Sequence, residues 1–283
     1  MKIRISVDST ADLNSELIEK YNIAVMPLLV TLKDITRRDG VDITTDELFE
    51  FVKQSGELPK TASPSIMVYQ EYFDNLLKDA DCVIHFVVSG KMSSCYNNAT
   101  KASEDYGIKV FVVDTKSLST GMALLALNAC DLAERGVEPP IIAKSCEDLV
   151  KYVQASFILG NLDYMHKGGR CSGAANLSAK FLRIKPEILV KDGEMIVGKK
   201  YIGKMEKVIE NYVDNTLASN PEYDRKRVFI THTPIDKGIV DIARSKLEGK
   251  FETIYETNAG ATIASHCGAG TLGVLFIASK IVK

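Results

Sequence analysis

Hydrophobic residues in the first half of the chain form short runs that alternate with amphipathic segments. The runs predict buried strands at Ile3–Asp8, Ala24–Leu32, Cys82–Val88 and Val110–Val113. The intervening segments predict helices at Leu13–Tyr21, Thr45–Ser55, Ser65–Leu77, from the Ser89–Ser94 turn to about Tyr106, at Gly121–Arg135, and from Pro139 onward. This β-α-β-α order predicts an α/β fold whose N-terminal domain has a parallel, doubly wound sheet.

The second half of the chain has a different pattern. Asp192-Gly193 separates two apolar runs, which predicts a hairpin with a two-residue turn. The other predicted elements are helices at Lys204–Ala218 and Lys237–Leu247 and strands at Val228–Thr231, Thr253–Thr257 and Leu272–Ala278. We therefore expect an α+β C-terminal domain, with domains at 1–157 and 158–283. Because no long linker joins them, a ligand crevice is expected at their interface.

Charge and hydropathy narrow the class of protein. Lys and Arg number 35 and Asp and Glu 37, a net charge of −2, which argues against a dedicated nucleic-acid-binding protein. No apolar run reaches the roughly 18–20 residues of a transmembrane helix, and the start, M-K-I-R-I-S-V-D, does not resemble a signal peptide. We expect a cytoplasmic protein.

Familiar catalytic and metal-binding motifs are missing from the sequence. The six cysteines form no C-x-x-C pair and the four histidines have no metal-ligand spacing, so we expect reduced thiols, no metal and no cofactor. G-x-S-x-G and the phosphate-binding P-loop are also missing, so no residue is predicted to be catalytic. Cys171 and Cys267 adjoin candidate site residues, and a neighbouring cation would lower a thiol pKa and make it sensitive to oxidation.

Two glycine-rich segments, Asn161–Ser172 and Ser265–Gly273, each contain a side chain suited to an anion. Arg170 follows two glycines that leave backbone amides open, and its guanidinium group matches a carboxylate or a phosphate. His266 precedes a glycine-rich turn. An exposed arginine and a structural histidine are the alternatives for these two residues, whereas His85, inside an apolar run, is predicted to be a core residue.

Hydroxyl side chains precede two of the predicted helices. Ser63 and Ser65 are either helix caps or ligand-binding residues, but Thr61 lies too far upstream to cap the helix easily. Ser93 lies in the Ser89–Ser94 loop, where it either caps the next helix or contributes to a cradle for a carboxylate or phosphate.

These segments also occur, in the same order, in one known family. The stretches are D-S-T-A-D-L from Asp8, T-A-S-P-S from Thr61, S-G-K-M-S-S-C-Y from Ser89, V-D-T-K-S-L-S-T-G from Val113, L-D-Y-M-H-K-G-G-R-C-S from Leu162 and H-C-G-A-G-T-L-G-V from His266. Along its whole length the chain resembles the DegV family. It departs from the usual family pattern at Ala62-Ser63, at Met92–Cys95 and at Cys267–Gly270.

The resemblance implies a non-catalytic, FakB-type acyl-carrier subunit of a bacterial fatty acid kinase. Such a protein binds one long-chain fatty acid, and a separate ATP-binding kinase subunit phosphorylates its carboxylate to an acyl phosphate for phospholipid synthesis. By position, Thr61 and Ser93 would bind the carboxylate, with Ser63 and His266 close to it. Arg170 would contact the kinase or the transferred phosphate. Transient contact with a membrane for lipid exchange is also expected.

The physical chemistry agrees with such a ligand. A tail of about fourteen methylenes supplies on the order of 10 kcal/mol of transfer free energy before the cost of association. Two alternatives remain: a module that binds another amphipathic acid without a kinase partner, and an acyl hydrolase with His266 as base and a nearby serine as nucleophile.

Overall fold

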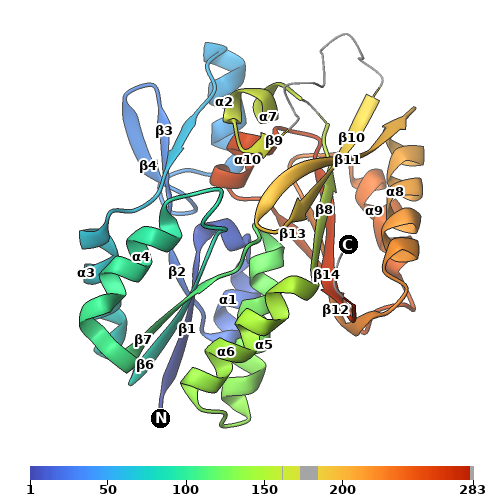
Figure 1. The fold of residues 1–283 in the computed structure, drawn as a ribbon. Helices are drawn as coiled ribbons and strands as arrows, with labels where there is room; N and C mark the ends of the chain where they lie inside the picture. The colour runs from blue at the N-terminus through green and yellow to red at the C-terminus, as the bar shows by residue number, and fades with distance from the viewer. Residues whose placement is uncertain (161, 173–183, 281–283) are drawn as a thin grey trace.

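The computed structural model describes residues 1–160, 162–172 and 184–280, and its N-terminal half is built on a parallel sheet (Figure 1). The strand order is β2-β1-β6-β7. The strands are β1 (Ile3–Asp8), β2 (Ala24–Met26), β6 (Cys82–Val87) and β7 (Val110–Asp114). Every residue of β6 is buried, as expected for a central parallel strand covered on both faces.

Helices cover both faces of this sheet, which confirms the predicted doubly wound domain (Figure 1). They are α1 (Ser15–Tyr21), α3 (Ile66–Leu77), α4 (Cys95–Ser103), α5 (Thr120–Glu134) and α6 (Pro139–Leu149). Helices α3 and α4 pack together on one side, and α5 and α6 on the other. Short 3-10 segments occur at Ser9–Ala11, Glu104–Lys109 and Val150–Tyr152.

The predicted single strand Ala24–Leu32 is wrong. Strand β2 ends at Met26, and β3 (Leu29–Leu32) leaves for a small antiparallel sheet with β4 (Ile35–Arg38) and β5 (Lys60–Ala62). Pro27 lies at the break, and a proline cannot donate a hydrogen bond within a sheet. Helix α2 (Thr45–Ser55) lies between β4 and β5 in the chain and begins with a capping box between Thr44 and Glu47.

The second half forms a seven-stranded mixed sheet of order β13-β12-β14-β8-β10-β11-β9. The strands are β8 (Val153–Ile158), β9 (Cys171–Ser172), β10 (Ile184–Lys191), β11 (Glu194–Ile202), β12 (Tyr223–His232), β13 (Thr253–Asn258) and β14 (Leu272–Ala278). Helices α8 (Met205–Ser219) and α9 (Lys237–Leu247) pack together beside it (Figure 1). The α+β prediction and the Asp192-Gly193 hairpin are confirmed.

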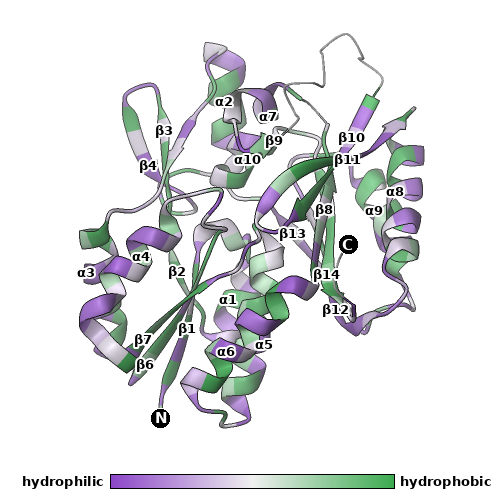
Figure 2. Ribbon diagram, in the orientation of Figure 1, coloured by the Kyte–Doolittle hydropathy of each residue, from purple (hydrophilic) through white to green (hydrophobic). Residues whose placement is uncertain are grey.

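The predicted domain boundary after residue 157 falls inside β8, which pairs with β14 and β10. Helix α5 contacts both sheets, β1 and β6 on one side and β8 and β14 on the other. Ten of its residues are buried, and one hydrophobic cluster extends from β1 to β10. Figure 2 shows this helix and the adjoining strands as largely hydrophobic. The two halves therefore share a core, and the division at residue 157 stays a prediction.

Two short helices were not predicted, α7 (Asp163–Gly168) and α10 (Ala261–Cys267). Each has fewer residues than the 11-residue window in which helical periodicity becomes readable. Both pack against each other at the top of the molecule in Figure 1, close to α2.

Candidate functional site

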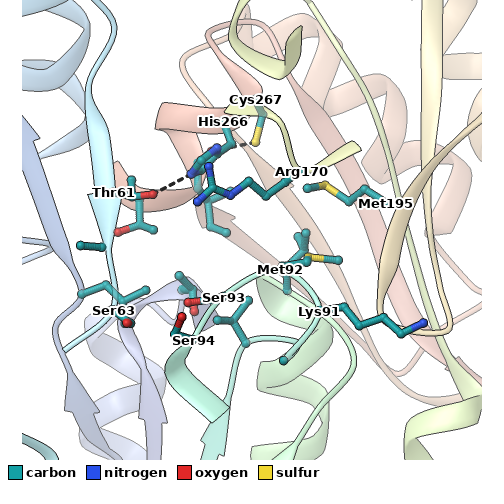
Figure 3. A pocket seen from close by; sticks show the side chains of 18 of the residues that line it. Thr61, Ser63, Lys91, Met92, Ser93, Ser94, Arg170, Met195, His266 and Cys267 are labelled. Atoms are coloured by element: carbon teal, nitrogen blue, oxygen red, sulfur yellow. Dashed lines mark hydrogen bonds between the residues drawn. The ribbon is translucent and has the colours of Figure 1, made fainter. Parts of the chain in front are cut away.

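A cavity of about 530 Å³ lies where the N-terminal loops meet α10 and the segment after α7 (Figure 3). The five residues singled out from the sequence come together in its lining: Thr61, Ser63, Ser93, Arg170 and His266. They come from β5 and the following turn, from the loop between β6 and α4, from the residue before β9, and from α10.

Thr61 and His266 are joined by a hydrogen bond. Thr61 Oγ1 lies 2.8 Å from His266 Nε2, and β5 holds Thr61 in register with Val30 of β3. On the other side of the ring, a Cβ at Gly168 would lie 2.7 Å from His266 Nδ1, so only glycine leaves room there. His266 Nδ1 has no hydrogen-bond partner among the described residues.

The imidazole of His266 is held in its neutral form. Burial, with a further contribution from the charge of Arg170, lowers its pKa to about 4. At neutral pH the ring is therefore a hydrogen-bonding group and not a counter-ion for an anion. The fixed positive charge at this end of the cavity belongs to Arg170, which Figure 3 shows beside the ring.

Two buried carboxyl groups hold the start of α10. Asp12 Oδ1 accepts a hydrogen bond of 2.8 Å from the Gly260 amide, and Asp39 Oδ1 accepts one of 2.9 Å from the Ala261 amide. Ser119 Oγ donates to Asp12 at 2.5 Å, and burial raises the pKa of Asp12 well above its usual value. Part of the D-S-T-A-D-L motif thus positions the helix that carries His266. The sequence contained no signal for this role because α10 itself was not predicted.

The serine hydroxyls lie across the cavity from His266 (Figure 3). Ser93 Oγ accepts from the Cys95 amide at 3.3 Å and donates to Cys95 Sγ at 3.1 Å, while Ser94 occupies the N-cap position of α4. Ser63 Oγ accepts a hydrogen bond of 3.2 Å from Asn98 Nδ2. The Ser63 hydroxyl proton has no acceptor among the described residues and is available to a ligand.

Arg170 is exposed at the edge of the cavity. Its guanidinium group donates a hydrogen bond of 2.7 Å to the Gly168 carbonyl oxygen, which uses one of its five N–H donors. Lys91 also lines the cavity and lies 3.5 Å from Glu194 in an exposed ion pair. Positive charge is therefore present at the mouth, where an anionic group would be reached from outside.

Most of the remaining cavity wall is apolar, although Thr10, Ser94, Asn97 and Thr262 also line it. The larger apolar side chains in the lining are Leu28, Val88, Met92, Leu118, Phe157, Met165, Met195, Ile263 and Cys267. A void of about 30 Å³ shares Leu118, Phe157, Ile263 and Cys267 with the cavity and continues toward Leu275 of β14. Hydroxyls at one end and an apolar extension at the other match an amphipathic acid.

Sequence reasoning missed Thr262 and misjudged Cys267. Thr262 is buried, lines the cavity one turn before His266, and its hydroxyl has no partner among the described residues. Burial raises the pKa of the Cys267 thiol, contrary to the predicted activation by a neighbouring cation. Among the described residues, no disulfide pairs the cysteines.

The remaining sequence predictions concern histidines, metals and membranes. His85 is a core residue as predicted, with Nδ1 2.9 Å from Ser6 Oγ and Nε2 3.3 Å from Asp8. Within residues 1–160, 162–172 and 184–280, no group of three His, Cys, Asp or Glu side chains could hold a metal ion. In the same ranges no helix combines the length and the apolar character needed to cross a membrane.

The chain is similar in sequence and in structure to several known proteins. The model of the DegV family, described as uncharacterised, matches residues 2–279. A fatty acid-binding protein from Thermotoga maritima is 32% identical over 281 residues, covering 96% of each chain. A fatty-acid-binding DegV family structure from Thermus thermophilus has a TM-score of 0.91 at 28% identity, covering 98% of this chain and 100% of its own. A stearic acid-binding protein from Eubacterium ventriosum has a TM-score of 0.81 at 26% identity, covering 98% of each chain.

Proposed function

The chain belongs to the DegV family, and we propose that it binds a long-chain fatty acid and presents the carboxylate to a separate kinase subunit. The observation that carries this proposal is the polarity of the cavity, with hydroxyls and Arg170 at the mouth and a lining of methionine, phenylalanine and aliphatic side chains beyond. Fatty acid binding by relatives with the same architecture supports it.

The carboxylate is bound by donors that are already held in place. When His266 donates its Nε2 proton to Thr61 Oγ1, the Thr61 hydroxyl proton is free to point at the ligand. Ser63 contributes its own free proton, and Ser93 contributes one by turning away from Cys95 Sγ. Hydrogen bonds to a carboxylate are the stronger, charge-assisted kind. Because the hydroxyl groups are small, they bind the anion and still leave it accessible to the phosphoryl donor.

The proposed phosphorylation uses ATP bound to the separate kinase subunit. A carboxylate oxygen of the fatty acid attacks the γ-phosphorus of ATP held by the kinase, the bond to the β-phosphate oxygen breaks, and acyl phosphate and ADP result. Arg170, at the mouth and beside His266, offsets the repulsion between the carboxylate and the nucleotide phosphates. On this proposal the protein works in the cytoplasm, exchanges lipid at the membrane surface and needs no cofactor.

Binding is tested first. Delipidated protein is titrated with palmitate, and the retained lipid is measured by native mass spectrometry. Thr61→Val and Ser93→Ala each weaken binding about tenfold, because each removes one hydrogen bond to a charged group. Thr36→Val is the matched control, since Thr36 is an exposed threonine of β4, in the same small sheet as Thr61. Wild-type protein that takes up no palmitate contradicts the proposal.

The role of the partner is tested separately, with a cognate kinase subunit and ATP. Wild-type protein gives acyl phosphate; Arg170→Ala retains palmitate but gives at least tenfold less product. Arg135→Ala, an exposed arginine beyond the end of α5, behaves as wild type. Lipid binding without acyl phosphate formation would identify a binding module with no kinase partner. Ester hydrolysis lost in Ser93→Ala would favour an acyl hydrolase, although Ser93 is hydrogen-bonded to Cys95.

A further inference from the structure

Asp8 ends β1 and is completely buried, with an exposed fraction of 0%. Its carboxyl group plays no part in the proposed contacts with the fatty acid. Strand β1 pairs with β6, so the end of β1 lies beside the loop Ser89–Ser94 that follows β6. This loop carries Ser93 to the cavity (Figure 3). Because burying a carboxyl group is costly unless donors surround it, the partners of Asp8 show what it holds.

The hydrogen bonds of Asp8 secure both ends of this loop. At the start, Asp8 Oδ2 accepts from the Val88 amide at 3.1 Å. At the end, Asp8 is hydrogen-bonded to the thiol of Cys95, the first residue of α4. Tyr69 of α3 donates to Asp8 Oδ1 at 2.9 Å and is hydrogen-bonded to the same thiol. The residues on either side of the loop are thus tied to one carboxyl group.

The hydrogen bonds run in one direction from the cavity to Asp8. Ser93 Oγ donates to Cys95 Sγ at 3.1 Å. Burial and the charge of Asp8 raise the pKa of the Cys95 thiol, so the sulfur keeps its proton. An ionised carboxyl group only accepts hydrogen bonds, so the thiol donates this proton to Asp8. The lone pairs of the sulfur are therefore left for Ser93, whose hydroxyl stays a donor.

Asp8 is itself held in place by its other neighbours. Among the described residues its ion-pair partner is His85, with Nε2 3.3 Å from Asp8 Oδ1. The His85 ring packs edge-on against Tyr69 and Phe73. Moving the carboxyl group would leave several buried polar groups without partners, which is destabilising. Asp8 therefore gives the loop a fixed point.

We infer that Asp8 is a positioning residue of the carboxylate site and acts on Ser93 through Cys95 and Val88. The inference rests on the proposed function, in which Ser93 turns its proton from Cys95 Sγ to the carboxylate of the fatty acid. Sulfur is a weak acceptor, so it keeps the hydroxyl in place without competing strongly for the proton. Without the charge of Asp8, the thiol proton is no longer drawn away from Ser93 and the loop loses its common anchor.

A double-mutant cycle on palmitate binding tests the inference, with delipidated protein and native mass spectrometry. Asp8→Asn preserves the shape of the side chain but replaces one acceptor oxygen by an NH₂ donor. We expect it to raise the dissociation constant about tenfold in the wild type. In Ser93→Ala the same change should have less than about a twofold effect, because the residue through which Asp8 acts is missing.

Cys95→Ala is a second route to the same cycle. It leaves Asp8 in place and removes the link to Ser93. It should weaken palmitate binding in the wild type and have little further effect in Ser93→Ala. This variant carries the test if Asp8→Asn does not fold, which far-UV circular dichroism establishes.

Infrared spectroscopy follows the thiol proton directly. The S–H stretching band of Cys95 is assigned by its disappearance in Cys95→Ala. In lipid-free protein, Asp8→Asn should shift this band to higher frequency, since the thiol loses a charged acceptor. Ser93→Ala should also shift it, because the sulfur loses its donor. Palmitate should move the band in the wild type, as Ser93 turns away, and should not move it in Ser93→Ala.

Asp114→Asn serves as the control. Asp114 ends the neighbouring strand β7, and its Oδ1 accepts from the Gly90 amide at 3.2 Å and from the Lys116 amide at 3.0 Å. It therefore holds the same loop, but through the backbone at Gly90. This change should alter the dissociation constant less than about twofold and leave the S–H band in place.

Three results would each overturn the inference: equal effects of Asp8→Asn in the wild type and in Ser93→Ala, an S–H band that Asp8→Asn does not shift, or the same loss of binding in Asp114→Asn. Wild-type protein that binds no palmitate contradicts the proposed function instead. The S–H band of lipid-free protein then still decides whether Asp8, Cys95 and Ser93 form one hydrogen-bonded series.

Discussion

At the scale of single residues, the site depends on a histidine that carries no charge. His266 lies between Thr61, which shares its Nε2 proton, and Gly168, which packs against Nδ1. A charged imidazolium here would lie beside Arg170 in a buried position. The neutral ring instead acts through Thr61, because the direction of the Thr61 proton depends on which histidine nitrogen carries a proton.

The titration of His266 tests this arrangement. Its pKa in the folded protein is lowered to about 4, below the value in an unfolded chain. Its contribution to stability is therefore complete above the unfolded pKa and is lost as the pH falls toward 4. Imidazole resonances followed by NMR should show a midpoint near 4, and Arg170→Ala should raise it because a like charge is removed. Arg135→Ala should leave it unchanged; a midpoint near the ordinary histidine value contradicts the assignment.

At the scale of elements, most of the longer helices and strands could be predicted from the sequence. α2 and α9 have the predicted bounds because each carries a full amphipathic pattern and a start signal. Helix α10 could not be predicted, since it has only seven residues, five of them buried, and so shows no readable periodicity. The candidate residues were singled out from the glycine-rich segments and from hydroxyls that precede helices, and the family resemblance implied their roles. Thr262 and the contacts of Asp12 depend on α10 and became visible only in the structure.

Asp12 offers a test of how α10 is held. It adopts a left-handed conformation, which Asn tolerates better than Ala, and its carboxyl group accepts from Gly260 and Ser119. Asp12→Ala should lower the free energy of unfolding by about 3 kcal/mol and weaken palmitate binding, because two buried donors lose their acceptor. Asp12→Asn should keep most of the stability and most of the palmitate binding of the wild type. Asp34→Ala, in an exposed turn, should change neither.

The pH dependence of the stability of wild type and Asp12→Asn gives an independent test of the Asp12 contacts. Burial raises the folded pKa of Asp12 above its unfolded value, so its stabilising contribution is complete below the unfolded pKa and is lost as the pH rises through the folded one. Urea denaturation should therefore show the stability of Asp12→Asn relative to wild type increasing with pH. A difference that is constant with pH contradicts the raised pKa.

Helix α5 is the element on which both sheets depend. Leu125 is fully buried between them, whereas Ile141 on α6 is largely exposed. Leu125→Ala should lower the free energy of unfolding by about 3 kcal/mol, the sum of lost transfer free energy and an unfilled cavity. Ile141→Ala should change it by less than about 0.5 kcal/mol. Chemical denaturation curves measure both; a small effect at Leu125 would mean that the sheets can close over the vacated space.

At the scale of the whole molecule, the two halves share α5, a hydrophobic cluster and an ion pair. Arg227 of β12 is buried and lies 2.8 Å from Asp131 at the end of α5, with Lys226 2.6 Å from the same carboxyl group. Both the cavity lined by Thr61 and His266 and its apolar extension are enclosed by residues from both halves. Neither half has a complete site without the other, and the larger of the hydrophobic clusters draws residues from both.

We therefore expect the chain to unfold as one cooperative unit, although its sequence predicts two domains. Hydrogen exchange in dilute urea, followed by mass spectrometry, should give peptides of β6 and of β14 the same opening free energy, because exposing either strand exposes α5.

Asp131→Ala, which leaves Arg227 buried without its partner, should lower both opening free energies together by about 3 kcal/mol. Asp241→Ala, from an exposed pair with Lys237, should change neither. Two separate opening free energies, with only the C-terminal one sensitive to Asp131, would mean that the halves are independent domains and that the cavity between them can open without global unfolding.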